Sequence, residues 1–236
     1  MFLQITDLDA GYGFLHILRE VNINIEEGEF SCLLGPNGTG KTTTLKTIAG
    51  LIKPISGSVK FNGEEIGGLP GNKVVQKGVV YVSEALNLFT NMTVHDNLLM
   101  GAFIVRDQEK VNERLDFVYT LFERLKQRHH QLAGTMSGGE RKMLAIARGL
   151  MSFPKVLLVD EPSFGLSPQM TDVVFEALGI LNREQNLTIL VVEQNATKTL
   201  EATQNGYVME NGVIVMHGPS QDLLADEQIQ KAYLGL

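Results

Sequence analysis

Residues 30–42 read FSCLLGPNGTGKT, and this stretch decides the fold. The first five residues are almost all apolar, as in a strand that is covered on both faces of a parallel sheet. The eight that follow fit the pattern G-x-x-x-x-G-K-[ST], which requires a strand before it and a helix after it. The stretch therefore predicts an α/β protein with a phosphate-binding loop between a buried strand and a helix.

The loop offers several groups to a phosphate chain. Its glycines let consecutive backbone N–H groups point at phosphate oxygens, and the helix that opens at Lys41 adds its N-terminal dipole. We expect Lys41 to neutralise the β- and γ-phosphates and the Thr42 hydroxyl to hold Mg²⁺. A chance glycine-rich turn is the alternative interpretation, which the flanking strand and helix disfavour. The predicted nucleotide-binding residues are Gly35, Pro36, Asn37, Gly38, Thr39, Gly40, Lys41, Thr42 and Thr43.

A second apolar run, residues 156–159, ends in the carboxylates Asp160 and Glu161. Ligands of open α/β sheets gather outside the carboxyl ends of strands, so this pair should lie near the phosphate loop. Asp160 is predicted to reach Mg²⁺, directly or through water, and Glu161 to polarise a water against the γ-phosphate. A strand end that simply meets solvent is the alternative, and the phosphate loop in the same chain weakens it.

The remaining apolar runs, residues 79–82 and 187–192, complete a mainly parallel sheet. Residues 93–150 lack strand signals and carry apolar residues at helical spacing. The predicted organisation is one domain, 1–236, in which a helical lobe, 88–154, is inserted into a core lobe formed by 1–87 and 155–236.

Antiparallel strands are expected towards both ends of the chain. Residues 21–25 alternate between apolar and polar side chains, as a half-buried strand does. Asn62-Gly63 and Asn211-Gly212 each mark a tight hairpin turn. An amphipathic helix is predicted over residues 222–234.

The composition limits the possible functions. The net charge is −7, so no basic surface favours a nucleic-acid partner. The single cysteine, Cys32, cannot form a disulfide within the chain. The first residues lack the features of a signal peptide, and no apolar run approaches the roughly 18 residues that a membrane span needs. We expect a soluble, intracellular protein.

Residues 135–144, TMSGGERKML, contain a second helix start that suits an anion. Ser137 and Glu140 have the spacing of a capping box, so a well-capped helix is the plain interpretation. That interpretation leaves Gly138 and Gly139 unexplained, because glycine in a helix costs about 1 kcal/mol relative to alanine. Two glycines expose backbone N–H groups to a ligand, and a helix N-terminus favours an anion. One nucleotide on one chain has no obvious need for two such helix starts.

Three motifs follow one another along the chain: GPNGTGKT, then SGGE ahead of a helix, then LLVDEP within twenty residues. This series resembles the ATP-binding subunits of ATP-binding cassette (ABC) transporters, and the resemblance covers the whole chain. The resemblance implies a P-loop NTPase with a RecA-like, mainly parallel sheet, an antiparallel β region and an inserted α-helical subdomain. In that family two cassettes meet head to tail, and each ATP lies between the phosphate loop of one and the Ser-Gly-Gly signature of the other. The resemblance therefore implies ATP and Mg²⁺ as cofactors and ATP hydrolysis as the reaction.

The resemblance also implies roles for single residues. Tyr12 matches the aromatic residue that stacks on adenine, with an ordinary turn tyrosine as the alternative. Glu84 stands where most members have a glutamine that senses Mg²⁺ and contacts the membrane subunit. Gln194 stands where most have a histidine on the γ-phosphate; it can donate a hydrogen bond but cannot carry a positive charge, and a merely solvated strand end is its alternative. Residues 163–167 match the loop that crosses the dimer interface. The implied sets are Glu161, Gln194 and Lys41 for catalysis; Thr42, Glu84 and Asp160 for the metal; and Ser137, Gly138, Gly139 and Glu140 for ATP on the partner cassette.

Within this family, four short segments resemble one branch, the ATPase subunits of branched-chain amino acid transporters of the LivF type. The segments are VEQNA, MSGGE, SxGLSP and the ending AYLG. Asn87 departs from that branch, in which a basic residue is expected. The branch implies three partners: a second ABC ATPase subunit, like or unlike this one; integral membrane permease subunits; and, indirectly, an extracytoplasmic binding protein. It also implies a cytoplasmic position on the inner face of the cell membrane. A related branch that imports urea or short amides shares much of the pattern.

Three other functions are alternatives. A P-loop kinase or other small-molecule phosphotransferase would have no use for Ser137-Gly138-Gly139. A soluble, non-transport ABC ATPase that works on nucleic acid or ribosomes typically has two cassettes or a coiled-coil insertion, neither of which occurs here. A degenerate cassette with a structural role only would not be expected to keep Lys41, Ser137 and Glu161.

Overall fold

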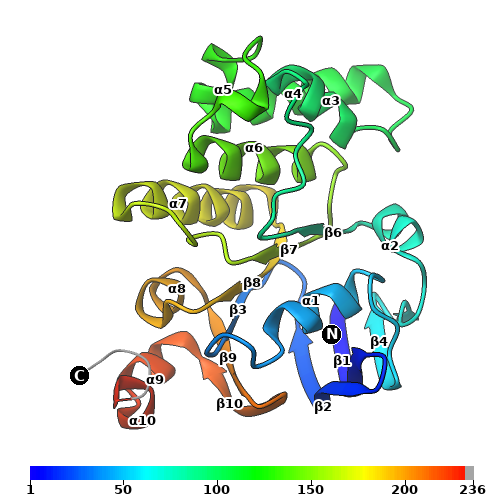
Figure 1. Cartoon of the computed structure of the whole chain (residues 1–236), viewed down its shortest axis with the longest axis vertical. Helices are drawn as coiled ribbons and strands as arrows, with labels where there is room; N and C mark the ends of the chain where they lie inside the picture. Colours follow the sequence, from blue (N-terminus) through cyan, green and yellow to red (C-terminus); the bar gives the residue numbers. More distant parts are fainter. Residues whose placement is uncertain (232–236) are drawn as a thin grey trace.

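The computed structural model describes residues 1–231, and two parts of the molecule are evident in Figure 1. The strands fill the lower part of the view, and a group of helices lies above them. The upper helices are α3 (Val94–Gly101), α4 (Gln108–Leu121), α5 (Glu123–Gln127) and α6 (Gly138–Leu150). Within residues 1–231 no helix is long and apolar enough to cross a membrane.

The central sheet has six strands in the order β10-β9-β3-β8-β7-β6. The four predicted apolar runs form β3 (Phe30–Leu34), β6 (Val79–Val82), β7 (Val156–Asp160) and β8 (Thr188–Glu193). They pair in parallel, as predicted, and β9 (Asn205–Glu210) joins β3 in the same direction. All carboxyl ends of these strands consequently meet at one edge of the sheet.

Both faces of the central sheet are covered, which explains why its strands are apolar throughout. Side chains of one face pack with α6, α7 (Pro168–Gln185) and α8 (Ala196–Ala202) in one buried cluster. Side chains of the other face pack with α1 (Lys41–Ile48) and with the second sheet. Along β3 the alternation is direct: Cys32 and Leu34 belong to the first cluster, and Leu33 to the second.

The second sheet is antiparallel, in the order β2-β1-β4-β5, and carries the predicted N-terminal strand. Its strands are β1 (Leu3–Tyr12), β2 (Leu15–Ile25), β4 (Ser56–Phe61) and β5 (Glu64–Glu65). Asn62-Gly63 connects β4 to β5, and Asn211-Gly212 connects β9 to β10 (Val213–Pro219). All four turn residues have positive φ angles, between 49° and 84°, as a two-residue hairpin turn requires. Both predicted turns are confirmed. The short helix α2 (Gly71–Lys77) lies between β5 and β6.

The prediction of one continuous helix over residues 222–234 is wrong, because the chain breaks at Asp226. The chain forms α9 (Ser220–Ala225) and then a separate short α10 (Glu227–Ile229). Asp226 adopts an extended conformation, and its Oδ1 accepts hydrogen bonds from the N–H groups of Gln228 and Ile229. This side chain starts a new helix and thereby breaks the first. The AYLG segment and the rest of residues 232–236 lie outside the described residues.

Candidate active site

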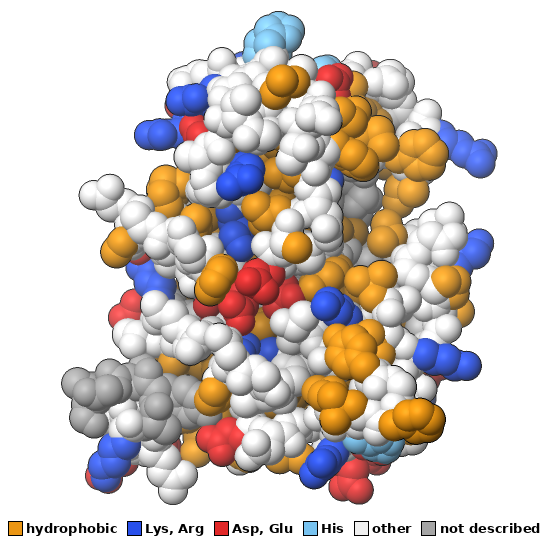
Figure 2. Space-filling view, viewed as in Figure 1, with side chains coloured by type: hydrophobic (Ala, Val, Ile, Leu, Met, Phe, Trp, Pro, Cys, Tyr) orange, Lys and Arg blue, Asp and Glu red, His pale blue; other side chains and the backbone are white. Residues whose placement is uncertain are grey.

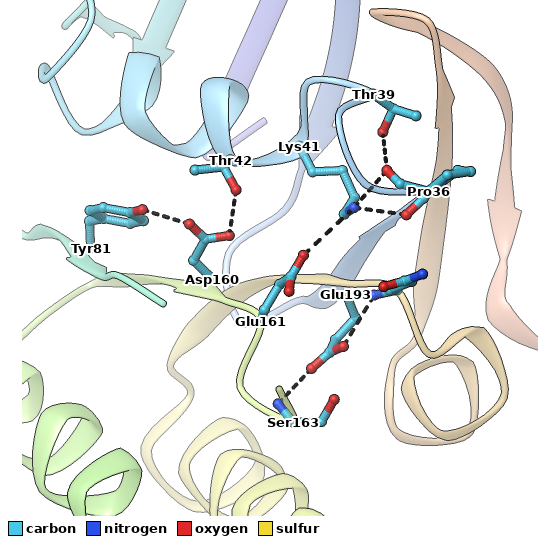
Figure 3. A network of polar contacts seen from close by, with 11 residues as sticks. Pro36, Thr39, Lys41, Thr42, Tyr81, Asp160, Glu161, Ser163 and Glu193 are labelled. Carbon is cyan, nitrogen blue, oxygen red and sulfur yellow. Dashed lines mark hydrogen bonds and ion pairs between the residues drawn. The ribbon is translucent and has the colours of Figure 1, made fainter. Parts of the chain in front are cut away.

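Lys41 is held inside the glycine-rich loop that follows β3 (Figure 3). Its Nζ donates hydrogen bonds to the backbone oxygens of Gly35, at 2.8 Å, and Pro36, at 3.0 Å. The Thr39 hydroxyl donates to the same Pro36 oxygen, at 2.9 Å. The Lys41 side chain is only 4% exposed, and this burial lowers the pKa of its ammonium group against the opposing pull of Glu161. The loop therefore holds a buried cation against two backbone carbonyl oxygens, 3.9 Å from the Glu161 carboxylate.

The N-terminus of α1 has free backbone donors. Gly40 precedes the helix at φ 111°, a conformation that side chains rarely adopt, and a Cβ there would lie 2.7 Å from Leu18 Cδ2. No side chain among the described residues caps this end, and the first turn contains no acidic residue. Because the first N–H groups of a helix have no partner within it, those of α1 are available to an anion.

Asp160, at the end of β7, is fixed from two sides (Figure 3). Its Oδ1 accepts a hydrogen bond from the Thr42 hydroxyl at 3.0 Å, and its Oδ2 accepts one from the Tyr81 hydroxyl at 2.7 Å. Burial, together with the Asp160 carboxylate, raises the pKa of Tyr81, so this phenol stays a donor. Thr42 and Asp160 thus meet as predicted, whereas the sequence analysis missed Tyr81.

Glu161 has an unusual backbone for a residue with a side chain. Its φ is 45°, in the left-handed region, and its N–H donates to Val192 O of β8 at 2.9 Å. The side chain points towards Lys41, with 3.9 Å between Oε1 and Nζ. Burial raises the pKa of this carboxyl group, although Lys41 opposes the shift. A carboxylate with a raised pKa accepts a proton more readily than an ordinary glutamate does.

The three polar residues that follow the apolar run of β8 differ in their surroundings. Glu193 is buried, and its two carboxylate oxygens accept hydrogen bonds from the N–H groups of Ser163, at 2.7 Å, and Gln194, at 3.1 Å. Asn195 caps the start of α8. The Gln194 side chain is exposed and faces a small cavity that Glu161 and Ser163 also line. Glu193 therefore fixes the loop after β7, a role that the sequence analysis did not foresee.

A cavity of about 380 Å³ opens over the phosphate loop. Glu84, Glu161 and Phe164 line it together with the loop and the start of α1. The Glu84 carboxylate has no hydrogen-bond partner within residues 1–231, so its predicted metal role stays a prediction. Tyr12 is not among the lining residues; it lies half exposed at the end of β1, and its contact with adenine likewise stays a prediction.

The predicted capping box at the start of α6 is present. Ser137 Oγ accepts from Glu140 N, and Glu140 Oε2 accepts from Ser137 N at 3.0 Å. The buried Glu140 also pairs with Arg128, at 3.0 Å, so its carboxylate is engaged within the chain. None of residues 137–140 lines the cavity over the phosphate loop.

The two glycines of this helix start have different surroundings. A Cβ on Gly139 would lie 2.6 Å from Met170 Cε and 3.3 Å from Met170 Cγ, so this glycine packs closely against α7. A Cβ on Gly138 would meet nothing within 4 Å. The structure therefore gives no packing reason for Gly138, whose N–H lies at an exposed helix start.

Asn87, the departure from the expected branch pattern, has a local explanation. It follows Leu86, and both residues have positive φ angles, of 47° and 61° respectively. Asparagine is among the side-chain residues that adopt this conformation most readily. Arg148 of α6 donates to the carbonyl oxygens of Leu86, at 2.9 Å, and Asn87, at 2.7 Å, so a cation already stabilises this loop.

Comparisons with known proteins support the geometry. The model of a family described as "ABC transporter" matches residues 18–164. The chain is 45% identical over 233 residues to the high-affinity branched-chain amino acid transport ATP-binding protein BraG of Pseudomonas aeruginosa, covering 99% of each chain. It is 39% identical over 234 residues to the probable branched-chain amino acid transport ATP-binding protein LivF of Archaeoglobus fulgidus, again covering 99% of each. A crystal structure of the ATP-binding cassette MJ1267 in its ADP conformation superimposes with a TM-score of 0.83 at 27% identity, over 100% of this chain and 99% of that one.

Proposed function

The chain belongs to the ABC transporter family as an ATP-binding and ATP-hydrolysing subunit, and we propose that it powers the uptake of branched-chain amino acids through separate membrane subunits. The observation that carries this proposal is the 45% identity to BraG over 99% of both chains. The similarity to LivF points to the same substrate class. The substrate itself would be selected by the other subunits.

The site residues fit a magnesium nucleotide. Thr42 and Asp160 bring two oxygen ligands within 3.0 Å of each other beside the phosphate loop, and oxygen is the ligand that Mg²⁺ prefers. Residues 1–231 contain no group of three or more His, Cys, Asp or Glu side chains placed to hold a metal ion, so phosphate oxygens and water would complete the coordination. Bound there, Mg²⁺ would neutralise charge on the β- and γ-phosphates.

Lys41 and Glu161 would act on the γ-phosphate. Lys41 exchanges its two carbonyl partners for phosphate oxygens, and the free N–H groups of α1 hold the same chain of phosphates. Glu161 orients a water and takes its proton as the water oxygen forms a bond to the γ-phosphorus. The bond from that phosphorus to the bridging oxygen breaks, and its electron pair leaves with ADP. Gln194 donates a hydrogen bond to a γ-phosphate oxygen.

A second cassette would complete the site. Ser137 and Gly138 lie at an exposed helix start and do not line the cavity over their own phosphate loop. We infer that they bind the γ-phosphate of an ATP on a partner cassette, which can be a copy of this chain or a related subunit. Glu140 would support this contact from within by fixing Ser137, because its carboxylate is already engaged.

An apolar groove suits a membrane partner. The groove has a volume of about 540 Å³ and lies between α2, α3, α6 and the loop after β6. Phe103, Met100 and Phe89 are exposed along it, and Figure 2 shows hydrophobic side chains gathered along this side, between the two parts of the molecule. Exposed apolar side chains that cluster in this way mark interaction sites. We propose that permease subunits dock here and hold the protein at the cytoplasmic face of the cell membrane, with an extracytoplasmic binding protein acting indirectly through them.

The substrate proposal is tested by uptake in cells that produce this protein. Replacing the chain by Glu161→Gln is expected to abolish uptake of radiolabelled leucine, isoleucine and valine, with urea uptake unchanged. Loss of urea or acetamide uptake, with leucine uptake intact, would instead support the related importer of short amides.

A further inference from the structure

Lys142 is a buried lysine whose partner lies in the active site. It belongs to the second turn of α6, is 4% exposed, and its Nζ donates a hydrogen bond to the backbone oxygen of Glu161 at 2.8 Å. The two residues come from different parts of the fold, since α6 belongs to the upper group of helices and Glu161 follows β7 of the central sheet. This single hydrogen bond joins the signature helix to the backbone of the proposed base.

The backbone of Glu161 needs such support. A left-handed conformation costs a residue with a side chain roughly 1–2 kcal/mol, and Glu161 has a φ of 45°. Its peptide groups are held on both sides, by Val192 O accepting from its N–H and by Lys142 donating to its carbonyl oxygen. The same carbonyl oxygen also accepts a hydrogen bond from the Phe164 N–H, at 3.2 Å, so without Lys142 it would lose the shorter of its two hydrogen bonds. A small change in φ or ψ would then swing the carboxylate away from Lys41.

The charge of Lys142 also suits its position. Burial lowers the pKa of its ammonium group, and the carboxylates of Glu193, Glu84, Asp160 and Glu161 oppose this shift. Figure 2 shows acidic side chains gathered in the middle of this face of the molecule. Lys41 is the other buried lysine close to these carboxylates. A second cation beside them reduces the repulsion that would push Glu161 outwards.

We propose that Lys142 is a positioning residue for ATP hydrolysis, which holds the backbone of Glu161 in the conformation that aims its carboxylate at the γ-phosphate. Lys142 acts through Glu161 and touches neither the nucleotide nor the attacking water. The inference rests on the proposed role of Glu161 as the base. It predicts a loss in turnover that leaves ATP binding unchanged.

The test compares Lys142→Met, which removes the donor at similar volume, with Lys142→Gln, whose amide retains one. Lys142→Met should lower the turnover number about tenfold or more, as expected for the loss of one well-placed interaction. Its affinity for ATP and its KM should stay within roughly twofold of the wild-type values. Lys142→Gln should recover part of the lost turnover.

Lys110→Met, which alters an exposed lysine at the start of α4, is the matched control and should behave like the wild type. Cooperative thermal unfolding of each variant checks that it folds.

A double-mutant cycle separates positioning from a general structural effect. If Lys142 acts only through Glu161, adding Lys142→Met to Glu161→Gln should cause no further loss of the residual turnover. A full additional loss in that background, wild-type turnover in Lys142→Met alone, or a matching fall in ATP affinity would overturn the inference and leave the ATPase assignment intact. Wild-type turnover in Glu161→Gln alone would overturn the role of Glu161 as the base, and the inference with it.

Discussion

At the scale of single residues, Glu161 combines a buried carboxylate, a raised pKa and a lysine within 4 Å. Glu161→Gln keeps the shape of this side chain but removes the proton acceptor. We expect turnover to fall by roughly 10²–10⁴-fold, which is the usual contribution of a positioned base. ATP binding should be retained, because Lys41 and the α1 N-terminus are untouched. Phosphate release and equilibrium ATP binding measure the two effects separately, and a variant with full turnover would rule out this base.

Cys32 gives a second prediction at this scale. It is fully buried in β3, and burial raises the pKa of its thiol to about 12. At pH 8 only on the order of 10⁻⁴ of the thiol is ionised, and the thiolate is the reactive form. Native protein should therefore resist a thiol reagent that modifies the urea-unfolded chain within minutes. Rapid modification of the native protein would show that β3 is accessible.

The candidate site was predictable from the sequence to the extent that its residues belong to local motifs. Lys41, Thr42, Asp160 and Glu161 were placed correctly beside one another, because the carboxyl ends of parallel strands share one edge. Tyr81, Lys142 and Glu193 were missed, because each reaches the site through a neighbouring element. No local sequence pattern indicates that β6 lies beside β7, or that the second turn of α6 contacts the residue after β7.

At the scale of elements, a substitution at the start of α6 can separate the stability of the helix from its proposed function in phosphate binding. Gly138→Asp adds a side chain into open space, and an acidic residue in the first turn of a helix is favourable. The thermal unfolding temperature should therefore stay the same or rise slightly. Turnover should be lost, because the new carboxylate repels the γ-phosphate of the partner's ATP.

Gly138→Asn is the matched control for this prediction. It has nearly the same size and lacks the charge, so it should retain more turnover than Gly138→Asp. Equal activity of Gly138→Asp and wild type would contradict the proposal that this helix start binds phosphate.

Helices, strands and turns were predicted best where a single physical requirement, such as burial or a positive φ angle, produces the sequence pattern. The four apolar runs became parallel strands and both Asn-Gly pairs became turns, and the superposition on a solved ATP-binding cassette confirms the expected fold class. The C-terminal helix was predicted as continuous, whereas it is interrupted at Asp226: the apolar periodicity continues across this residue while its side chain caps a new helix. At Gly139 and Glu140, packing against Met170 and pairing with Arg128 were beyond any local signal.

At the scale of the whole molecule, the apolar groove predicts how the protein reaches the membrane. Phe103 is 84% exposed beside it. Phe103→Asp should abolish co-purification with the membrane fraction, because a charge is costly in an apolar contact, while ATPase activity in solution is kept. Val215→Asp, at an exposed apolar residue of β10 away from the groove, is the control and should stay membrane-associated. Membrane association of Phe103→Asp at the wild-type level would place the docking surface elsewhere.

The central claim is that each ATP is hydrolysed between the phosphate loop of one chain and the signature of another. It is tested most directly by mixing two inactive variants, Lys41→Ala and Gly138→Asp, and measuring phosphate release. A mixed dimer contains one intact site, formed by the loop of the Gly138→Asp chain and the signature of the Lys41→Ala chain. The account predicts that turnover appears on mixing, up to about a quarter of the wild-type value because half of the dimers are mixed and each has one site. Turnover that stays at the level of the separate variants, under conditions in which the wild-type chain is active, would contradict it.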